Sequence, residues 1–487
     1  MKMYKLFFLA LLINVGFVSC SEDADDVGPT PPTTGGEGET RDLTVENFAW
    51  RGMNNIYLYK ADIPQLANDY FASQAERNDF LDNFETPEDL FYDGLMSSQD
   101  RFSWIVDDYV ELENLFSGIS TTTGMNYSLG TYGENANLVF GVVRYVLPGT
   151  SAEAKGIKRG DLFTRINGEQ MTITNYSALL APEVLDVTLA TIEGNTITET
   201  GEVTLTKAEY SSNPVYITKT IDLDGMKIGY LMYNSFTDDY DEDLNDAFNY
   251  FKGENITELI LDLRYNGGGS VRTATDLAAM ITGQFPGEIF LKEEWNAEYQ
   301  DYFLRNNPNR LVNKFNTQLT TGTAINSLNL DRVYVLTTTR SASASELIIN
   351  GLEPYIDVIH IGDKTTGKFT ASTTLYDSPN FGRQNASTRH TYALQPLIFK
   401  SLNANGVSDY VDGLYPDFEF KEDIRNYGVL GDENEPLLNA ALNYIQGNRI
   451  SMPEGFKPFN VVGESGMELP TYQKMYVKEI PGFLERE

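Results

Sequence analysis

The chain has 487 residues, of which 41% are hydrophobic, so it is long enough for about three domains with buried cores. Its formal net charge of −34 argues against nucleic acid as a partner, because a phosphate backbone repels such a chain. A single cysteine excludes an intramolecular disulfide and a thiolate metal cluster, and two histidines make a zinc site unexpected. These counts therefore predict no metal site.

Residues 1–20 have the pattern of an export leader. Lys2 and Lys5 precede the apolar run Leu6–Ile13, which is shorter than the roughly 20 residues that a membrane span needs. The sequence therefore predicts export from the cytoplasm rather than a transmembrane helix at this end.

Cys20 ends the leader and stands where the lipobox of bacterial lipoproteins has an acylated cysteine, although Phe17 departs from the smaller aliphatic residue usual in that box. Residues 21–42, first acidic and then rich in Pro, Thr and Gly, predict a flexible tether. The acidic start resembles the surface-export signal of Bacteroidetes lipoproteins, with a solvated spacer as the alternative. This resemblance implies an outer-membrane lipoprotein of the cell envelope, held in the lipid bilayer by acylated Cys20 and facing the periplasm or the cell surface.

Three folded regions are predicted after the tether. Helical periodicity predicts a small helical N-terminal domain over residues 43–125. Short strand-like runs separated by turn signals predict a β-rich domain over residues 130–210. Strands and helices then alternate over residues 215–447, which predicts an α/β core with parallel strand pairs, and residues 448–487 form an extension of unknown role. The elements expected in the core are strands at 227–231, 258–264, 332–337 and 358–361, and helices at 241–251, 271–281, 345–352 and from about 434.

The β-rich region resembles a PDZ domain, on the strings Pro148–Glu153, Gly156–Leu162 and Ile166–Gly168. PDZ modules add a peptide to a sheet edge and hold its C-terminal carboxylate in a Gly-Leu-Gly-Phe-like loop. The resemblance implies peptide binding here, and a purely structural unit is the alternative. The nearest equivalent of the loop, with its glycine in a different position, is Leu138-Val139-Phe140-Gly141.

A serine and a lysine are the chemically most informative residues of the core. Ser343 falls between a predicted strand and a predicted helix, and Lys368 follows 25 residues later. A lysine can replace the histidine of the usual serine hydrolase as the base. However, Ser343 and Glu346 also match the S-x-x-E capping box, so a purely structural helix cap is the alternative.

Three blocks, Asp262–Gly269, Ser341–Glu346 and Gly362–Lys368, resemble the signatures of the tail-specific, or C-terminal processing, serine peptidases. With Asp100–Ser103 and the PDZ-like region, the resemblance covers roughly residues 45 to 447. It implies a ClpP/crotonase-like core of βαβ units and an endopeptidase that recognises the C-terminal segment of polypeptide substrates. The alternative is a surface lipoprotein with the same fold that binds peptides or other ligands with little or no turnover. The oligomeric state is not predicted.

By position, the resemblance makes Ser343 the nucleophile and Lys368 its general base. The acyl transfer that this implies requires no metal and no organic cofactor. It implies an oxyanion hole formed by backbone N–H groups of Ala344 and of Gly267 or Gly268. Glu346 would support the dyad, whereas other members use a glutamine at the position of Ser372 in this chain.

The remaining candidates are weaker. A lysine base must be neutral, which requires an apolar pocket, and Phe369 with the strand Val358–Ile361 is the expected source of that pocket. Lys364 is a rival base that misses the family spacing. His360 is expected in the core, and His390 on the surface or in a strand.

Overall fold

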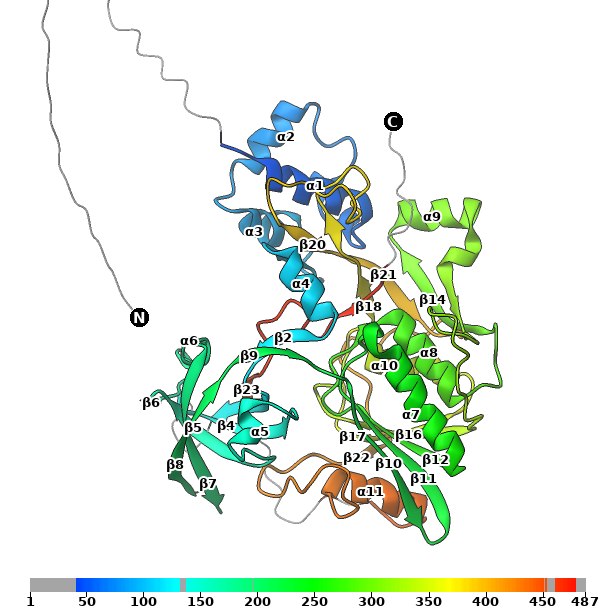
Figure 1. Ribbon diagram of the computed structural model, residues 1–487. Coiled ribbons are helices and arrows are strands. Elements are labelled where there is room, and N and C mark those ends of the chain that lie inside the picture. Colours follow the sequence, from blue (N-terminus) through cyan, green and yellow to red (C-terminus); the bar gives the residue numbers. More distant parts are fainter. Residues whose placement is uncertain (1–40, 132–136, 195, 451, 453–459, 479–487) are drawn as a thin grey trace, which may run out of the picture. The chain divides into compact units, whose positions relative to one another are not determined.

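The computed structural model describes residues 41–131, 137–194, 196–450, 452 and 460–478 (Figure 1). The predicted leader, Cys20 and nearly all of the predicted tether lie outside these residues. From Leu43 onward the chain forms one compact unit. In the described ranges, no helix has both the length and the apolar character needed to cross a membrane.

A six-stranded sheet forms the centre of the predicted α/β region. β10 runs antiparallel to β11, and every later pair of neighbours is parallel. This confirms the predicted α/β class. The strands, in spatial order, are β10 (Val215–Leu223), β11 (Met226–Tyr233), β12 (Glu258–Asp262), β16 (Arg332–Thr337), β17 (Asp357–Gly362) and β22 (Phe418–Glu419).

Helices cover both faces of this central sheet, because its strands are apolar on both sides. Leu231 and Tyr233 of β11 belong to the buried cluster of α7, α8 and α10, whereas Tyr230 and Met232 belong to the cluster of α11. Figure 1 shows α11 on the opposite side of the sheet from the other three helices. The helices are α7 (Asp241–Glu254), α8 (Val271–Ile281), α10 (Ala344–Leu352) and α11 (Pro436–Ile445).

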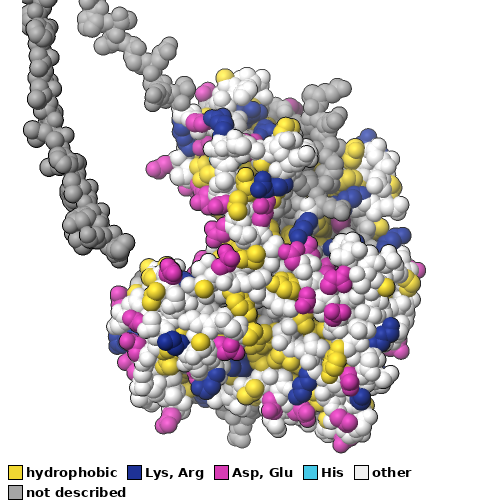
Figure 2. All heavy atoms as spheres, in the orientation of Figure 1, with side chains coloured by type: hydrophobic (Ala, Val, Ile, Leu, Met, Phe, Trp, Pro, Cys, Tyr) yellow, Lys and Arg dark blue, Asp and Glu magenta, His cyan; other side chains and the backbone are white. Residues whose placement is uncertain are grey.

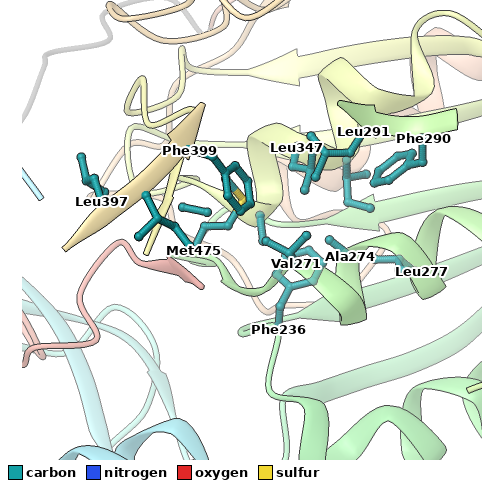
Figure 3. Packing of buried hydrophobic residues seen from close by; sticks show 14 of the residues in the cluster. Phe236, Val271, Ala274, Leu277, Phe290, Leu291, Leu347, Leu397, Phe399 and Met475 are labelled. Atoms are coloured by element: carbon teal, nitrogen blue, oxygen red, sulfur yellow. The ribbon is translucent and has the colours of Figure 1, made fainter. Parts of the chain in front are cut away.

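A second six-stranded sheet contains a strand from the C-terminal extension. Met475 of this strand, β24, is fully buried and lies in the same cluster as Val271 and Phe399 (Figure 3). The extension, to which the sequence pattern assigned no role, therefore completes a core sheet. The order is β13 (Gly269–Ser270), β24 (Met475–Tyr476), β18 (Thr370–Ser372), β21 (Leu397–Leu402), β14 (Ile289–Trp295) and β15 (Val312–Lys314), with α9 (Ala297–Asn306) following β14.

The N-terminal helices share a core with the central sheet. Phe48 and Met53 of α1 lie in the same buried cluster as Leu261 and Leu394. β1 (Trp104–Val106) pairs with β20 (Ala393–Gln395), which also pairs with β19 (Leu375–Tyr376). The helices here are α1 (Thr44–Ile56), α2 (Gln74–Leu81), α3 (Pro87–Asp89), which continues into a π turn (Leu90–Leu95), and α4 (Tyr109–Phe116).

The β-rich region forms a seven-stranded sheet with its own buried cluster. A strand of the C-terminal extension, β23, lies at its edge beside β3. The order is β23 (Val461–Glu464), β3 (Met125–Thr131), β4 (Val139–Val146), β5 (Leu162–Ile166), β7 (Val184–Glu193) and β8 (Thr196–Thr206), with β6 (Glu169–Gln170) on β5. The same region contains two short helices, α5 (Ser151–Ala154) and α6 (Tyr176–Leu180). The strand that precedes β3 in the chain, β2 (Ile119–Thr122), pairs with the strand that follows β8, β9 (Ala208–Ser211).

Charged side chains are dispersed over the face shown in Figure 2. Asp and Glu side chains are spread across it, and the Lys and Arg side chains visible there form no continuous patch. The displayed face of the described residues thus has no basic surface for a phosphate backbone.

Candidate active site

Ser343 lies at the turn between β16 and α10, at the carboxyl edge of the central sheet. Its backbone has φ 64° and ψ −112°, a conformation that side-chain-bearing residues rarely adopt and that costs about 1–3 kcal/mol. The predicted capping box is present, with Ser343 N–H donating to Glu346 Oε2 at 2.7 Å. A helix cap does not require a strained backbone conformation, and strained residues are concentrated at functional sites. The conformation of Ser343 therefore favours a functional role for its hydroxyl.

Lys368 meets Ser343 in the interior. Its Nζ lies 3.4 Å from Ser343 Oγ, and both side chains are 0% exposed. Burial lowers the pKa of Lys368 well below its usual value, and the nearby Lys474 ammonium lowers it further, against the opposing charges of Asp100 and Glu346. The geometry therefore joins a hydroxyl to an amine whose neutral form is favoured.

Glu346 fixes the backbone on both sides of this pair. Its Oε2 accepts the N–H groups of Ser343 and Lys368, the latter at 2.9 Å, and its Oε1 accepts Gly367 N–H at 2.6 Å and Thr365 Oγ–H at 2.5 Å. Burial raises the pKa of Glu346, and these hydrogen bonds oppose the rise. Glu346 is thus a positioning residue that ties the lysine turn to the serine turn.

The glycine loop after β12 lies directly against Ser343. A Cβ atom on Gly268, whose φ is 109°, would come within 2.6 Å of Ser343 Cβ, so only glycine fits. Gly268 N–H donates to Asn266 Oδ1 at 2.9 Å, and is therefore already engaged. Ala344 opens α10, where the first N–H groups have no partner within the helix. With Gly268 N–H engaged by Asn266, Ala344 and Gly267 remain as the predicted oxyanion donors.

Four other predicted residues have their hydrogen bonds or close contacts with groups other than Ser343 and Lys368. Lys364 is exposed, and its Nζ lies 3.4 Å from Asp412 O. Ser372 Oγ donates to Gln395 Oε1 at 2.9 Å. His360 is buried as predicted, and burial lowers its pKa to about 4. His390 is half-buried, with Nε2 3.1 Å from Asp377 Oδ2.

The predicted peptide loop Leu138-Val139-Phe140-Gly141 leads into an interior strand. β4 pairs with β3 on one side, and on the other Gly141 pairs with Phe163 and Val139 N–H donates to Met171 O. Both sides of this run are therefore already hydrogen-bonded. The neighbouring strand β3 is the one whose outer side takes an added strand, because β23 occupies it.

Phe102 and Lys474 complete the surroundings of Lys368. The ring centroid of Phe102 lies 5.3 Å from Lys368 Nζ, so this ring, rather than the predicted Phe369, is the aromatic group beside the amine. Lys474 Nζ donates to the carbonyl of Phe102, and burial lowers the pKa of Lys474 to about 8. The string Asp100–Ser103 was a sequence signal for Phe102, whereas Lys474 had none.

A cavity of about 200 Å³ lies beside the glycine loop, lined by residues that include Gly267, Gly268, Lys474 and Tyr476. A second, of about 580 Å³, lies between α4, β2 and β3 and shares Ser465 and Leu469 with the first. Within the described residues, no cluster of His, Cys, Asp and Glu side chains has the arrangement of a metal site.

Comparison with known proteins identifies the family to which the sequence is similar. The models of peptidase family S41 and of the peptidase S41 N-terminal domain match residues 227–417 and 44–104, together just over half of the chain. The carboxyl-terminal-processing peptidase 2, chloroplastic, of Arabidopsis thaliana is 30% identical over 51% of this chain and 49% of its own length. A carboxyl-terminal-processing protease of Picosynechococcus is 23% identical over 61% of this chain and 65% of its own. The match thus spans from half to just under two-thirds of these relatives.

A solved structure gives the same assignment over a longer span. A crystal structure of a protein from Bacteroides fragilis NCTC 9343, assigned to the S41 proteases, has 29% sequence identity and a TM-score of 0.64. The similarity covers 82% of this chain and 97% of that one. The chain belongs to peptidase family S41.

Proposed function

We propose that this protein is a serine endopeptidase of the C-terminal processing type, with Ser343 as nucleophile and Lys368 as general base. The observation that carries the proposal is the 3.4 Å separation of Ser343 Oγ and Lys368 Nζ, both fully buried, with a lysine pKa lowered by burial. A neutral amine at this position can accept the hydroxyl proton, which a charged lysine cannot.

The reaction follows from these positions. Lys368 Nζ takes the proton of Ser343 Oγ–H as Oγ bonds to the peptide carbonyl carbon, and N–H groups of Ala344 and Gly267 hold the developing oxyanion. The proton then passes from Nζ to the leaving amine as the C–N bond breaks. Water, deprotonated by Lys368, releases the acyl group and restores Ser343.

The β-rich region is proposed to bind the C-terminal segment of the substrate in the manner of a PDZ domain. Support comes from β3, whose outer side accepts an antiparallel strand, and from Tyr176 of α6 beside that strand. The groove between β3 and α6 replaces the predicted loop at residues 138–141 as the proposed peptide site.

Anchoring of this enzyme to the cell envelope through acylated Cys20 also remains a proposal, supported by the lipobox-like position of that residue. Expression of the full chain with radiolabelled palmitate should label the protein, and Cys20→Ser should abolish the label. An unlabelled wild-type protein would contradict the anchor without affecting the peptidase proposal.

The test of catalysis compares two lysines four residues apart. Ser343→Ala and Lys368→Met should each reduce hydrolysis of fluorescein-labelled β-casein to background, while the exposed Lys364→Met should leave it close to wild type. Persistent hydrolysis in Ser343→Ala would refute the assignment. Casein binding without hydrolysis in the wild type would favour the alternative of a peptide-binding protein with this fold.

A further inference from the structure

The C-terminal segment, residues 460–478, contacts both places where a substrate is proposed to bind. Its first strand, β23, lies at the edge of the β-rich sheet, and its second, β24, lies in the second six-stranded sheet between β13 and β18. The two strands are only ten residues apart, so one continuous peptide reaches both sites.

The first contact has the form of a bound peptide. β23 runs antiparallel to β3, with Val461 opposite Gly130 and Glu464 opposite Ser128. On the side of α6, Tyr176 O–H donates to Val462 O at 3.3 Å, and a Cβ on Gly463 would lie 3.0 Å from the same hydroxyl oxygen. A strand placed between a sheet edge and a helix is the arrangement of β-augmentation.

Glu464 clamps the segment between its two strands. This carboxylate is 5% exposed and pairs with Arg144 through Oε2 and with Arg340 Nη1 through Oε1 at 2.5 Å. Tyr472 O–H also donates to Oε1. Because Arg340 lies three residues before Ser343, the clamp fixes the segment to the loop that carries the nucleophile.

The second contact lies on the glycine loop itself. β24 is parallel to β13 and to β18, with Tyr476 opposite both Ser270 and Ser372. A Cβ on Gly268 would lie 2.7 Å from Lys474 O and 2.6 Å from Ser343 Cβ, so the Lys474 carbonyl and the nucleophile flank the same glycine. β24 therefore fills the gap between the strand after the glycine loop and the strand after Lys368.

The segment lies beside a proposed catalytic pair that is closed to solvent. Ser343 and Lys368 are both 0% exposed, and the cavity beside the glycine loop is lined in part by Thr471–Lys474 of the segment. A polypeptide must reach Ser343 Oγ in an extended conformation to be cleaved. With β24 in place, the gap through which it would approach is filled.

We propose that residues 460–478 are a tethered competitor of the substrate. In this segment β23 occupies the groove between β3 and α6, and β24 occupies the gap between β13 and β18 beside Ser343. The inference rests on the proposed function and adds its regulation: a substrate is cleaved only after it displaces this segment. Tethering gives such a segment an effective concentration of order mM, so weak or poorly matched polypeptides are excluded.

A reversible cross-link tests the proposal. Ser372→Cys with Tyr476→Cys, in a Cys20→Ser background, joins register partners whose Cα separation in neighbouring strands suits a disulfide. Asp222→Cys with Lys227→Cys, register partners in the β10–β11 hairpin, is the matched control. Hydrolysis of labelled β-casein and, in a Ser343→Ala background, its binding by fluorescence anisotropy are measured before and after reduction.

We expect the oxidised Ser372–Tyr476 pair to lose at least tenfold in both hydrolysis and casein binding, reduction to restore both, and the hairpin control to be unaffected by redox state. Equal hydrolysis and equal binding in both states would overturn the inference and leave the peptidase proposal intact. If casein binding depends on the redox state but no hydrolysis occurs in either state, the peptidase proposal is refuted and the inference of a competing segment stands. No casein binding to the reduced form would also overturn the inference.

A second variant tests release without a cross-link. Glu464→Gln weakens the clamp to Arg144 and Arg340, so we expect hydrolysis of β-casein to increase severalfold, a direction that mere destabilisation does not produce. Unchanged or lower hydrolysis in a folded Glu464→Gln protein would count against the proposal.

Discussion

Two buried polar clusters lie at the end of neighbouring strands of the central sheet, and they have opposite electrostatic character. One surrounds Arg264, after β12, and the other surrounds Ser343, after β16, and Lys368, after β17. Arg264 and Lys368 are both 0% exposed. Burial alone therefore does not decide whether a basic side chain is charged.

Partners make the difference. Arg264 Nη2 lies 2.7 Å from Asp262 Oδ2, and Nη1 lies 2.7 Å from Glu435 Oε1, so its charge is matched on two sides. Although burial alone would raise the pKa of Glu422, Arg159 and Arg264 bring it down to about 2. Lys368 Nζ instead faces a hydroxyl, and burial lowers its pKa. Paired charges thus build a scaffold, whereas a buried amine beside a hydroxyl becomes a base.

The largest effect should come from replacing the neutral amine of Lys368 with a permanent cation. Lys368→Arg supplies a guanidinium that does not deprotonate and so cannot accept the Ser343 proton, and kcat/KM for β-casein should fall about 10³-fold or more. Lys364→Arg, four residues away and exposed, should change kcat/KM less than twofold. Substantial activity in Lys368→Arg would show that the contrast between the two clusters is not the basis of catalysis.

Removing the cation of the paired cluster should affect stability. Arg264→Met leaves Asp262 and Glu435 buried without their partner, and the free energy of unfolding should fall by about 3–5 kcal/mol in denaturant titrations. Arg305→Met, which breaks an exposed pair with Asp301, should cost no more than about 0.5 kcal/mol. Equal losses in the two variants would mean that the buried network is not stabilised by its pairing.

The two clusters should also respond at opposite ends of the pH scale. Glu422 contributes stability that is present above its unfolded pKa of 4.5 and is lost as pH falls towards about 2, roughly 3 kcal/mol in all. Lys474 beside Lys368 has a folded pKa of about 8, so the unfolded chain binds more protons between pH 8 and 10.5, and stability rises there by a similar amount.

Unfolding titrations across pH measure both slopes. Glu422→Gln should reduce the acid slope and leave the alkaline one. Lys474→Met should leave the acid slope and reduce the alkaline one, of which the part due to Lys368, whose pKa burial also lowers, should persist. If the stability of Lys474→Met rises with alkaline pH as much as that of the wild type, groups other than Lys474 cause the rise.

The smallest effect should come from Glu346→Gln. The amide keeps one acceptor but turns an NH₂ group towards N–H donors, so we expect a loss of about 1–3 kcal/mol, seen as a 10- to 100-fold fall in kcat. Because Glu346 positions Lys368 through its backbone, the pH dependence of kcat should also shift. If Glu346→Gln lowers stability but leaves kcat and its pH dependence unchanged, Glu346 acts only as part of the helix cap.

The α/β core was predictable from local sequence pattern. The helix Val271–Ile281 and the strand Arg332–Thr337 begin and end where they were expected, since buried parallel strands and amphipathic helices have apolar patterns that are readable over 6 to 11 residues. The Ser343 and Lys368 pair was predicted from spacing that resembles a family, and the structure brings the two side chains together.

Features formed by distant partners were not predictable. β24 is two residues long, and a two-residue strand has no periodicity. Lys474 and the clamp at Glu464 depend on residues hundreds of positions away, so nothing near them in the sequence indicates their environment. The interior position of residues 138–141 was missed for the same reason, because strand order is a property of the whole sheet.

The pairing of Tyr476 with Ser270 also has a consequence for the order of folding. The two residues are separated by roughly 200 positions, and contacts of such long range form late because a large loop must close first. We expect the central sheet to assemble before the last strand joins it. Each newly made molecule would then pass through an intermediate with an open cleft, and its final folding step would cover its own nucleophile.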